Sequence, residues 1–169
     1  MTTASLFDTV RGLPVHVLVN HAAVVLVPLV MLAVVAVAVM PRWRARFVVW
    51  AFLASVAVVP LVGVTILSGR ELKDRVPATG STREAIQDHE ALGNWVFWFV
   101  LAVAIATAVL AVLMRASGSR ASGRSGSPLL TNVVAGLVVV LALLSLVQAA
   151  RAGEAGSSAV WRSTVGSTS

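Results

Sequence analysis

Four long stretches of the chain contain no charged residue, and the charges lie between and beyond them. The uncharged stretches run from Gly12 to Pro41, from Phe47 to Gly69, from Ala91 to Met114 and from Ser125 to Ala150. Each is at least as long as the roughly 20 residues that an α-helix needs to cross about 30 Å of hydrocarbon. A soluble protein would have to be much larger than this one to bury four such helices in succession. The pattern therefore predicts an all-α fold, an integral membrane four-helix bundle.

The same pattern sets the predicted domain organisation. Residues 1–150 form one transmembrane domain, with four spans at about 14–40, 47–67, 92–114 and 129–149. Three further segments are assigned by their composition, namely a helical hairpin outside the membrane at 69–90, a flexible cytoplasmic linker at 116–128 and a disordered tail at 151–169. The linker is rich in serine and glycine, which is typical of flexible connections.

The predicted hairpin carries helix signals on both of its arms. Gly69–Val76 can prolong the second helix until Pro77 and Gly80 stop it. The segment Ser81–Glu84 has the form of a capping box, in which a serine hydroxyl and a glutamate side chain satisfy free N–H groups of the first turn. We therefore expect the third helix to begin near Thr82.

The distribution of charge predicts the topology. The first and third connections each hold three arginines and no acid, whereas the second holds more acids than bases. Short loops rich in Lys and Arg stay in the cytoplasm. Both termini and the second connection are therefore predicted to lie on the extracytoplasmic side. Tryptophans at positions 43, 50, 95 and 98 fall near the two predicted interfaces, where such side chains commonly anchor a helix.

Composition narrows the partners and the chemistry. Only 12% of the residues are charged, against roughly 25% in soluble domains, so the expected partner is the lipid bilayer. No soluble face combines basic and aromatic residues, and no nucleic-acid partner is expected. The chain has no cysteine, which excludes disulfides, iron–sulfur clusters held by this chain and covalent c-type haem. The remaining strong metal ligands are three histidines, His16, His21 and His89.

The predicted topology brings all three histidines to the extracytoplasmic half. His16 and His21 are separated by about 7.5 Å along a helix and about 140° around it, so they cannot share one narrow face. Further polar residues fall on the same half, namely Asn20, Thr65, Ser68, Asn94 and Gln148. Polar residues within spans usually face the bundle interior or a site, and bundle ends can build cofactor sites. No arrangement of nucleophile, base and acid is visible, so no catalytic residue is predicted.

Several segments resemble one bacterial membrane family. The segment Leu13–His21 reads Leu-Pro-Val-His-Val-Leu-Val-Asn-His and precedes an apolar run with Pro28. It is similar to the opening of the family known as domain of unknown function 2231. Its actinobacterial members also resemble Trp43–Arg46, Ser68–Leu72 and Asp88–Gly93. These similarities cover most of residues 13–115, whereas the fourth span matches only in being apolar.

The resemblance implies a multi-pass protein of the bacterial cytoplasmic membrane with two histidines near its start. Many members have proline after the first histidine and Phe-Pro after the second, where this chain has Val17 and Ala22–Ala23. The family implies no established activity. Related domains occur with cytochrome or Rieske partners, which suggests a redox membrane by analogy of fold.

The first functional hypothesis is a b-type haem held between the first and third spans. Haem b requires only axial ligands, which His89 with either His16 or His21 would supply. The remaining histidine would hydrogen-bond a propionate or a quinone, and the module would exchange electrons with quinone or a redox protein. Three basic residues could pair with the propionates, namely Arg70, Arg75 and Arg83.

Two other hypotheses remain open. A copper or zinc site would use His16, His21 and His89 together with Asp88 or Glu90, although the histidines differ in depth. Alternatively, the protein is a cofactor-free accessory subunit that packs against a larger complex or against copies of itself. Small residues in the third and fourth spans would allow such close packing.

Overall fold

The computed structural model describes residues 9–10, 13–74, 80–118 and 127–165. Four helices account for nearly all of them, α1 (Val15–Val39), α2 (Pro41–Lys73), α3 (Gly80–Gly118) and α4 (Pro128–Val165). All four are long and apolar enough to cross a membrane. The predicted all-α membrane bundle is thereby confirmed. One small addition is a pair of two-residue antiparallel strands before α1, β1 (Thr9–Val10) and β2 (Leu13–Pro14).

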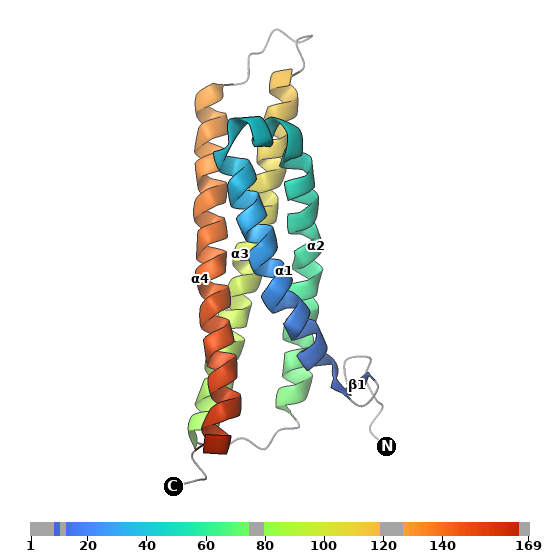
Figure 1. Cartoon of the computed structure of the whole chain (residues 1–169), viewed down its shortest axis with the longest axis vertical. Coiled ribbons are helices and arrows are strands. Elements are labelled where there is room, and N and C mark those ends of the chain that lie inside the picture. Colours follow the sequence, from blue (N-terminus) through green and yellow to red (C-terminus); the bar gives the residue numbers. More distant parts are fainter. Residues whose placement is uncertain (1–8, 11–12, 75–79, 119–126, 166–169) are drawn as a thin grey trace.

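The helices form a closed antiparallel ring. Each packs against its neighbours in sequence, and α4 returns to pack against α1. Helices α1 and α3 are therefore diagonally opposed, as are α2 and α4. The start of α1, the end of α2, the start of α3 and the end of α4 lie at the same end of the bundle (Figure 1). We call this the histidine end, because His16 and His89 lie there, and the opposite end, with Arg42, Arg44 and Arg46, the arginine end.

The bundle is apolar on its outside as well as its inside. Valine, alanine and single Leu and Met side chains fill the core, including Val27, Met31, Val100 and Leu110. Large apolar side chains also point outward, and Trp50 and Trp98 are 69% and 60% exposed. A soluble bundle would place polar residues there, so the exposed apolar surface is the lipid-facing surface.

The corner between α1 and α2 is fixed by a proline and a buried arginine. Met40 has an extended backbone because the following Pro41 disfavours the helical conformation before it, and α2 then starts at that proline. The Arg44 guanidinium donates to the Ala38 carbonyl at the end of α1 and, at 2.9 Å, to Asn132 Oδ1 on α4. Arg44 is only 8% exposed, so it ties three helices together at the arginine end.

The structure corrects one predicted segment and moves one boundary. Residues 151–165, which were expected to be disordered, continue α4 as a helix. Ala152 of this extension is buried against the bundle, and tertiary packing of that kind stabilises a helix whose glycines would otherwise weaken it. Helix α3 begins at Gly80, two residues before the expected Thr82, with a positive φ of 56° that glycine tolerates. Residues 119–126 of the predicted linker and 166–169 of the predicted tail lie outside the described residues.

Candidate functional site

Two of the three predicted histidines meet at the histidine end of the bundle. His16 lies in the first turn of α1 and His89 lies in the third turn of α3. Their ring centroids are 6.2 Å apart and their planes are nearly perpendicular, at 81°. Because α1 and α3 are diagonally opposed, the two rings approach each other across the bundle rather than along one interface.

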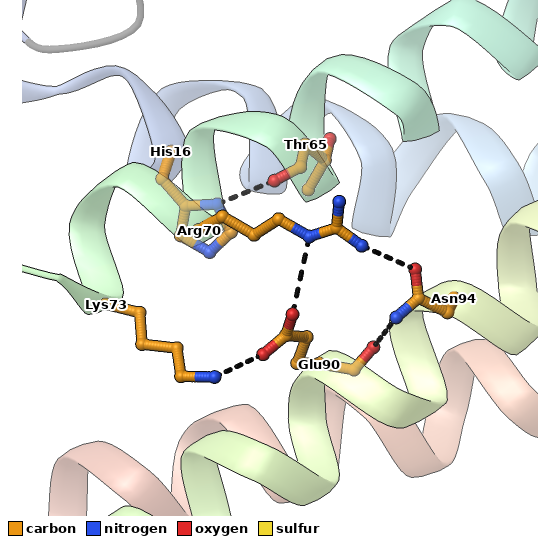
Figure 2. A network of polar contacts seen from close by, with 6 residues as sticks. All are labelled: His16, Thr65, Arg70, Lys73, Glu90 and Asn94. Carbon is orange, nitrogen blue, oxygen red and sulfur yellow. Dashed lines mark hydrogen bonds and ion pairs between the residues drawn. The ribbon is translucent and has the colours of Figure 1, made fainter.

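The imidazole of His16 is held by α2. Its Nδ1 lies 3.0 Å from the carbonyl oxygen of Thr65 (Figure 2). It also lies 3.3 Å from Ser68 Oγ, and Ser68 itself donates to the same carbonyl. A carbonyl oxygen only accepts hydrogen bonds, so Nδ1 of His16 carries the proton. Ser68 is 1% exposed, which removes water as a competitor for this contact.

The imidazole of His89 is held by α4 in the same way. Its Nδ1 donates to the carbonyl oxygen of Ala152 at 2.8 Å. This contact explains why the extension of α4 beyond the apolar run matters to the site. Each of the four helices therefore contributes, two with an imidazole and two with the carbonyl that orients it.

Two glycines allow the rings to approach the helix backbones. A Cβ atom at Gly69 would lie 3.0 Å from Cε1 of His16, and one at Gly156 would lie 2.9 Å from Nδ1 of His89. Both distances are shorter than ordinary van der Waals contact, so a side chain at either position would displace the ring. The sequence analysis did not identify Gly156, because it lay in a segment that was expected to be disordered.

These contacts decide the tautomers of the pair. Every hydrogen bond that either ring makes to a described residue uses Nδ1. In a neutral imidazole with a protonated Nδ1, Nε2 carries a lone pair. Fixing one nitrogen by a backbone carbonyl and leaving the other as a lone-pair donor is the usual arrangement of histidines that bind a metal.

His21 does not join the pair. Its side chain is exposed on α1, and its Nδ1 donates to the carbonyl of Val17 in its own helix at 2.6 Å. Among the described residues no group of three or more His, Cys, Asp or Glu side chains is placed to hold a metal ion. Asp88 is exposed, and Glu90 is engaged in ion pairs. The three-histidine copper or zinc centre is therefore not formed by this arrangement.

A network of charged and polar side chains borders the histidine pair. The Glu90 carboxylate accepts from Lys73 Nζ at 2.6 Å and from Arg70 Nε at 3.3 Å. Arg70 also donates to Asn94 Oδ1 at 3.4 Å, and Asn94 donates back to the Glu90 carbonyl at 3.0 Å (Figure 2). The hydrogen bond from Lys73 is the main cause that lowers the pKa of Glu90, which lies before the uncharged part of α3. The network links the end of α2 to the start of α3.

The other polar residues singled out in the sequence have different positions. Thr65 supplies its carbonyl to His16, whereas its hydroxyl donates to Leu61 in the same helix at 2.8 Å. Gln148 accepts from Arg151 at 3.4 Å. Arg83 is exposed on α3, and Arg75 lies outside the described residues.

Comparison with known proteins identifies a family. Residues 12–169 match the family described as predicted membrane protein (DUF2231). The match includes the fourth helix and its extension. The resemblance of individual segments had covered only the apolar character of the fourth span. No curated protein and no solved structure matches the chain. Since the match spans nearly the whole sequence, the chain belongs to the DUF2231 family of predicted membrane proteins.

Proposed function

We propose that His16 and His89 are the axial ligands of a b-type haem, and that the protein is an electron-transfer module of the membrane. The observation that carries the proposal is the pairing of the two imidazoles across the bundle, each with its Nδ1 fixed by a carbonyl of a neighbouring helix. Haem b is held by axial side chains such as histidine without covalent attachment, so a chain without cysteine can bind it.

The spacing of the rings fits this use. If His16 and His89 held one metal, each would bring a ring nitrogen to about 2.0–2.1 Å from it, and their ring centroids would be at most on the order of 6 Å apart. The observed separation of 6.2 Å agrees with that value. The ring planes are nearly perpendicular, at 81°, and the carbonyls of Thr65 and Ala152 hold each ring in its orientation.

The residues of the chain have distinct roles in this proposal. His16 and His89 would bind the haem iron, and the carbonyls of Thr65 and Ala152 would fix the tautomer and orientation of each ring. The bound group would supply one-electron redox chemistry. We place the histidine end on the extracytoplasmic side of the bacterial cytoplasmic membrane, because the arginine end carries the short, strongly basic connection around Arg44. Electrons would then be exchanged with quinone or with a redox protein at that side.

The test is an absorption spectrum of the detergent-purified protein, oxidised and then reduced with dithionite, after expression with added haem precursor. We expect the sharp reduced bands of a six-coordinate b haem, and their loss in His16→Ala and His89→Ala. The matched control is His21→Ala, which should keep the spectrum because His21 faces outward on α1. His89→Gly with added imidazole should recover the bands, which separates loss of a ligand from loss of the fold.

Electron paramagnetic resonance gives a second readout. Nearly perpendicular axial rings predict a strongly anisotropic low-spin ferric signal rather than the rhombic signal of parallel rings, since the observed interplanar angle is 81°. Bands that survive in both His16→Ala and His89→Ala would contradict the proposed ligands. A wild-type protein that binds no haem would leave the cofactor-free accessory subunit as the better description, and co-purification with a partner would be the next measurement.

A further inference from the structure

The charged network beside the histidine pair includes two residues that are direct sequence neighbours of the histidine site. Arg70 directly follows Gly69, whose backbone packs against the His16 ring, and Glu90 directly follows His89. In Figure 2 the guanidinium of Arg70 reaches from α2 toward Asn94 on α3. The network thus joins α2, whose backbone packs against His16, to α3, which carries His89, at the histidine end of the bundle.

One of the two cations of this network, Arg70, is only loosely engaged. Charge-assisted N–H···O bonds are typically about 2.7–2.9 Å long. The contacts of Arg70 with Glu90 and Asn94 are longer, at 3.3 and 3.4 Å, whereas the contact between Lys73 and Glu90 is short, at 2.6 Å. The side chains of Arg70 and Lys73 are 53% and 38% exposed, so both can reorient without disturbing the core.

The network also has more donors than charged acceptors. A guanidinium and an ammonium group offer eight N–H donors between them. In the described part of the chain, the one side-chain carboxylate bonded to them is that of Glu90. Arg70 and Lys73 could donate hydrogen bonds to a further carboxylate with little rearrangement. A planar guanidinium is especially suited to a carboxylate, because it can donate two parallel bonds.

We propose that Arg70 and Lys73 receive the carboxylate substituents of the group held by His16 and His89, and that Glu90 occupies their donors until that group binds. This inference rests on the proposed function, and for a b-type haem the carboxylates are its two propionates. The arrangement predicts opposite effects on ligand binding for two kinds of substitution. Removing the cations weakens binding of the carboxylate-bearing ligand, whereas removing the competing Glu90 carboxylate strengthens it.

The experiment compares haem b with its dimethyl ester, in which both propionates have lost their charge. Each is titrated into haem-free purified protein, and the ratio of the two dissociation constants is measured. We expect the wild-type protein to prefer the free acid by at least about tenfold, which corresponds to about 1.4 kcal/mol. The double variant Arg70→Gln/Lys73→Gln should lose this preference while keeping the absorption spectrum of a histidine-ligated haem.

Two further variants complete the design. Glu90→Gln should raise the preference for the free acid, because it releases both cations from their internal carboxylate. Arg42→Gln is the matched control, since Arg42 is exposed at the opposite, arginine end of the bundle and should leave the ratio unchanged.

The outcomes separate this inference from the proposed function. A ratio of the two dissociation constants that is the same in the wild-type protein and in the double variant would overturn the role of Arg70 and Lys73 but leave the histidine ligands intact. A protein that binds neither form would overturn both. Comparing the ratio between variants cancels the greater tendency of the ester to dissolve in detergent, because that tendency affects every variant equally.

Discussion

Replacing Gly156 by alanine adds a single methyl group and tests how closely the His89 ring packs against α4. The new Cβ would lie 2.9 Å from Nδ1 and 3.0 Å from Cε1 of the ring. Ordinary contact begins at 3.4 Å, so the ring or the helix must move by about half an ångström. The ring cannot easily move, because its Nδ1 is bonded to the carbonyl of Ala152 in the same helix. Gly153 provides a matched control, since a Cβ there meets no atom within 4 Å.

The size of the effect follows from three contributions. Alanine favours a helix over glycine by about 0.5–1 kcal/mol, and this gain applies to both variants. For Gly156→Ala it is opposed by overpacking of about 1–3 kcal/mol and by loss of a hydrogen bond of about 0.5–1.5 kcal/mol. We therefore expect Gly153→Ala to stabilise the protein slightly and Gly156→Ala to destabilise it. The free energies of unfolding of the two variants should differ by about 1.5–4.5 kcal/mol.

The assay is thermal unfolding of both variants in the same detergent, followed by circular dichroism. For a chain of this size 1 kcal/mol corresponds to about 2–4 °C, so the two midpoints should differ by roughly 3–18 °C. If the haem proposal holds, Gly156→Ala should also weaken haem binding by about 10–100-fold, as loss of an orienting contact to a ligand does. Equal midpoints for the two variants would refute the tight seat of His89 on α4.

Three further predictions follow from other parts of the bundle. Arg44→Met should lower the free energy of unfolding by about 2 kcal/mol, because it leaves the carbonyl at the end of α1 without its charged donor. Arg42→Met, at an exposed position, should change this free energy by less than about 0.5 kcal/mol. Denaturant unfolding in detergent micelles measures both. Ser145→Ala should leave stability unchanged or raise it slightly, since this buried hydroxyl has no hydrogen-bond partner among the described residues, and a clear loss in thermal unfolding would reveal a hidden partner. The chain has no cysteine, so cysteines introduced at exposed Ser157 and Ser127 report topology directly; we expect a membrane-impermeant maleimide to label the first but not the second in intact cells, and the reverse would invert the proposed orientation.

The family match and the histidine pair contribute different information about function. The family description names a membrane location and no activity. The geometry adds the specific feature on which the proposal depends, which is a pair of imidazoles with fixed tautomers. The decisive experiments therefore address His16, His89 and their supporting contacts rather than the membrane character of the chain.

The number and approximate positions of the helices were determined by the sequence. An uncharged stretch of more than 20 residues has one favourable environment, the hydrocarbon of a bilayer, and there the backbone must satisfy its hydrogen bonds within a helix. That local requirement predicted four helices without any knowledge of their contacts. It failed for residues 151–165, where the chain is no longer apolar but the helix continues, with Ala152 and Gly156 in contact with His89 of α3.

The composition of the site was decided only by the tertiary structure. Hydropathy identifies a span but does not fix the rotation of its helix, so the sequence left His16 and His21 as alternative partners of His89. Packing turned His16 and His89 toward each other and His21 outward. The carbonyls of Thr65 and Ala152 and the missing side chains of Gly69 and Gly156 have no chemical signature in a sequence, because their role depends on backbone atoms brought close by other helices. The sequence thus determined which residues had to enter the membrane, and the packing of four helices decided which of them meet.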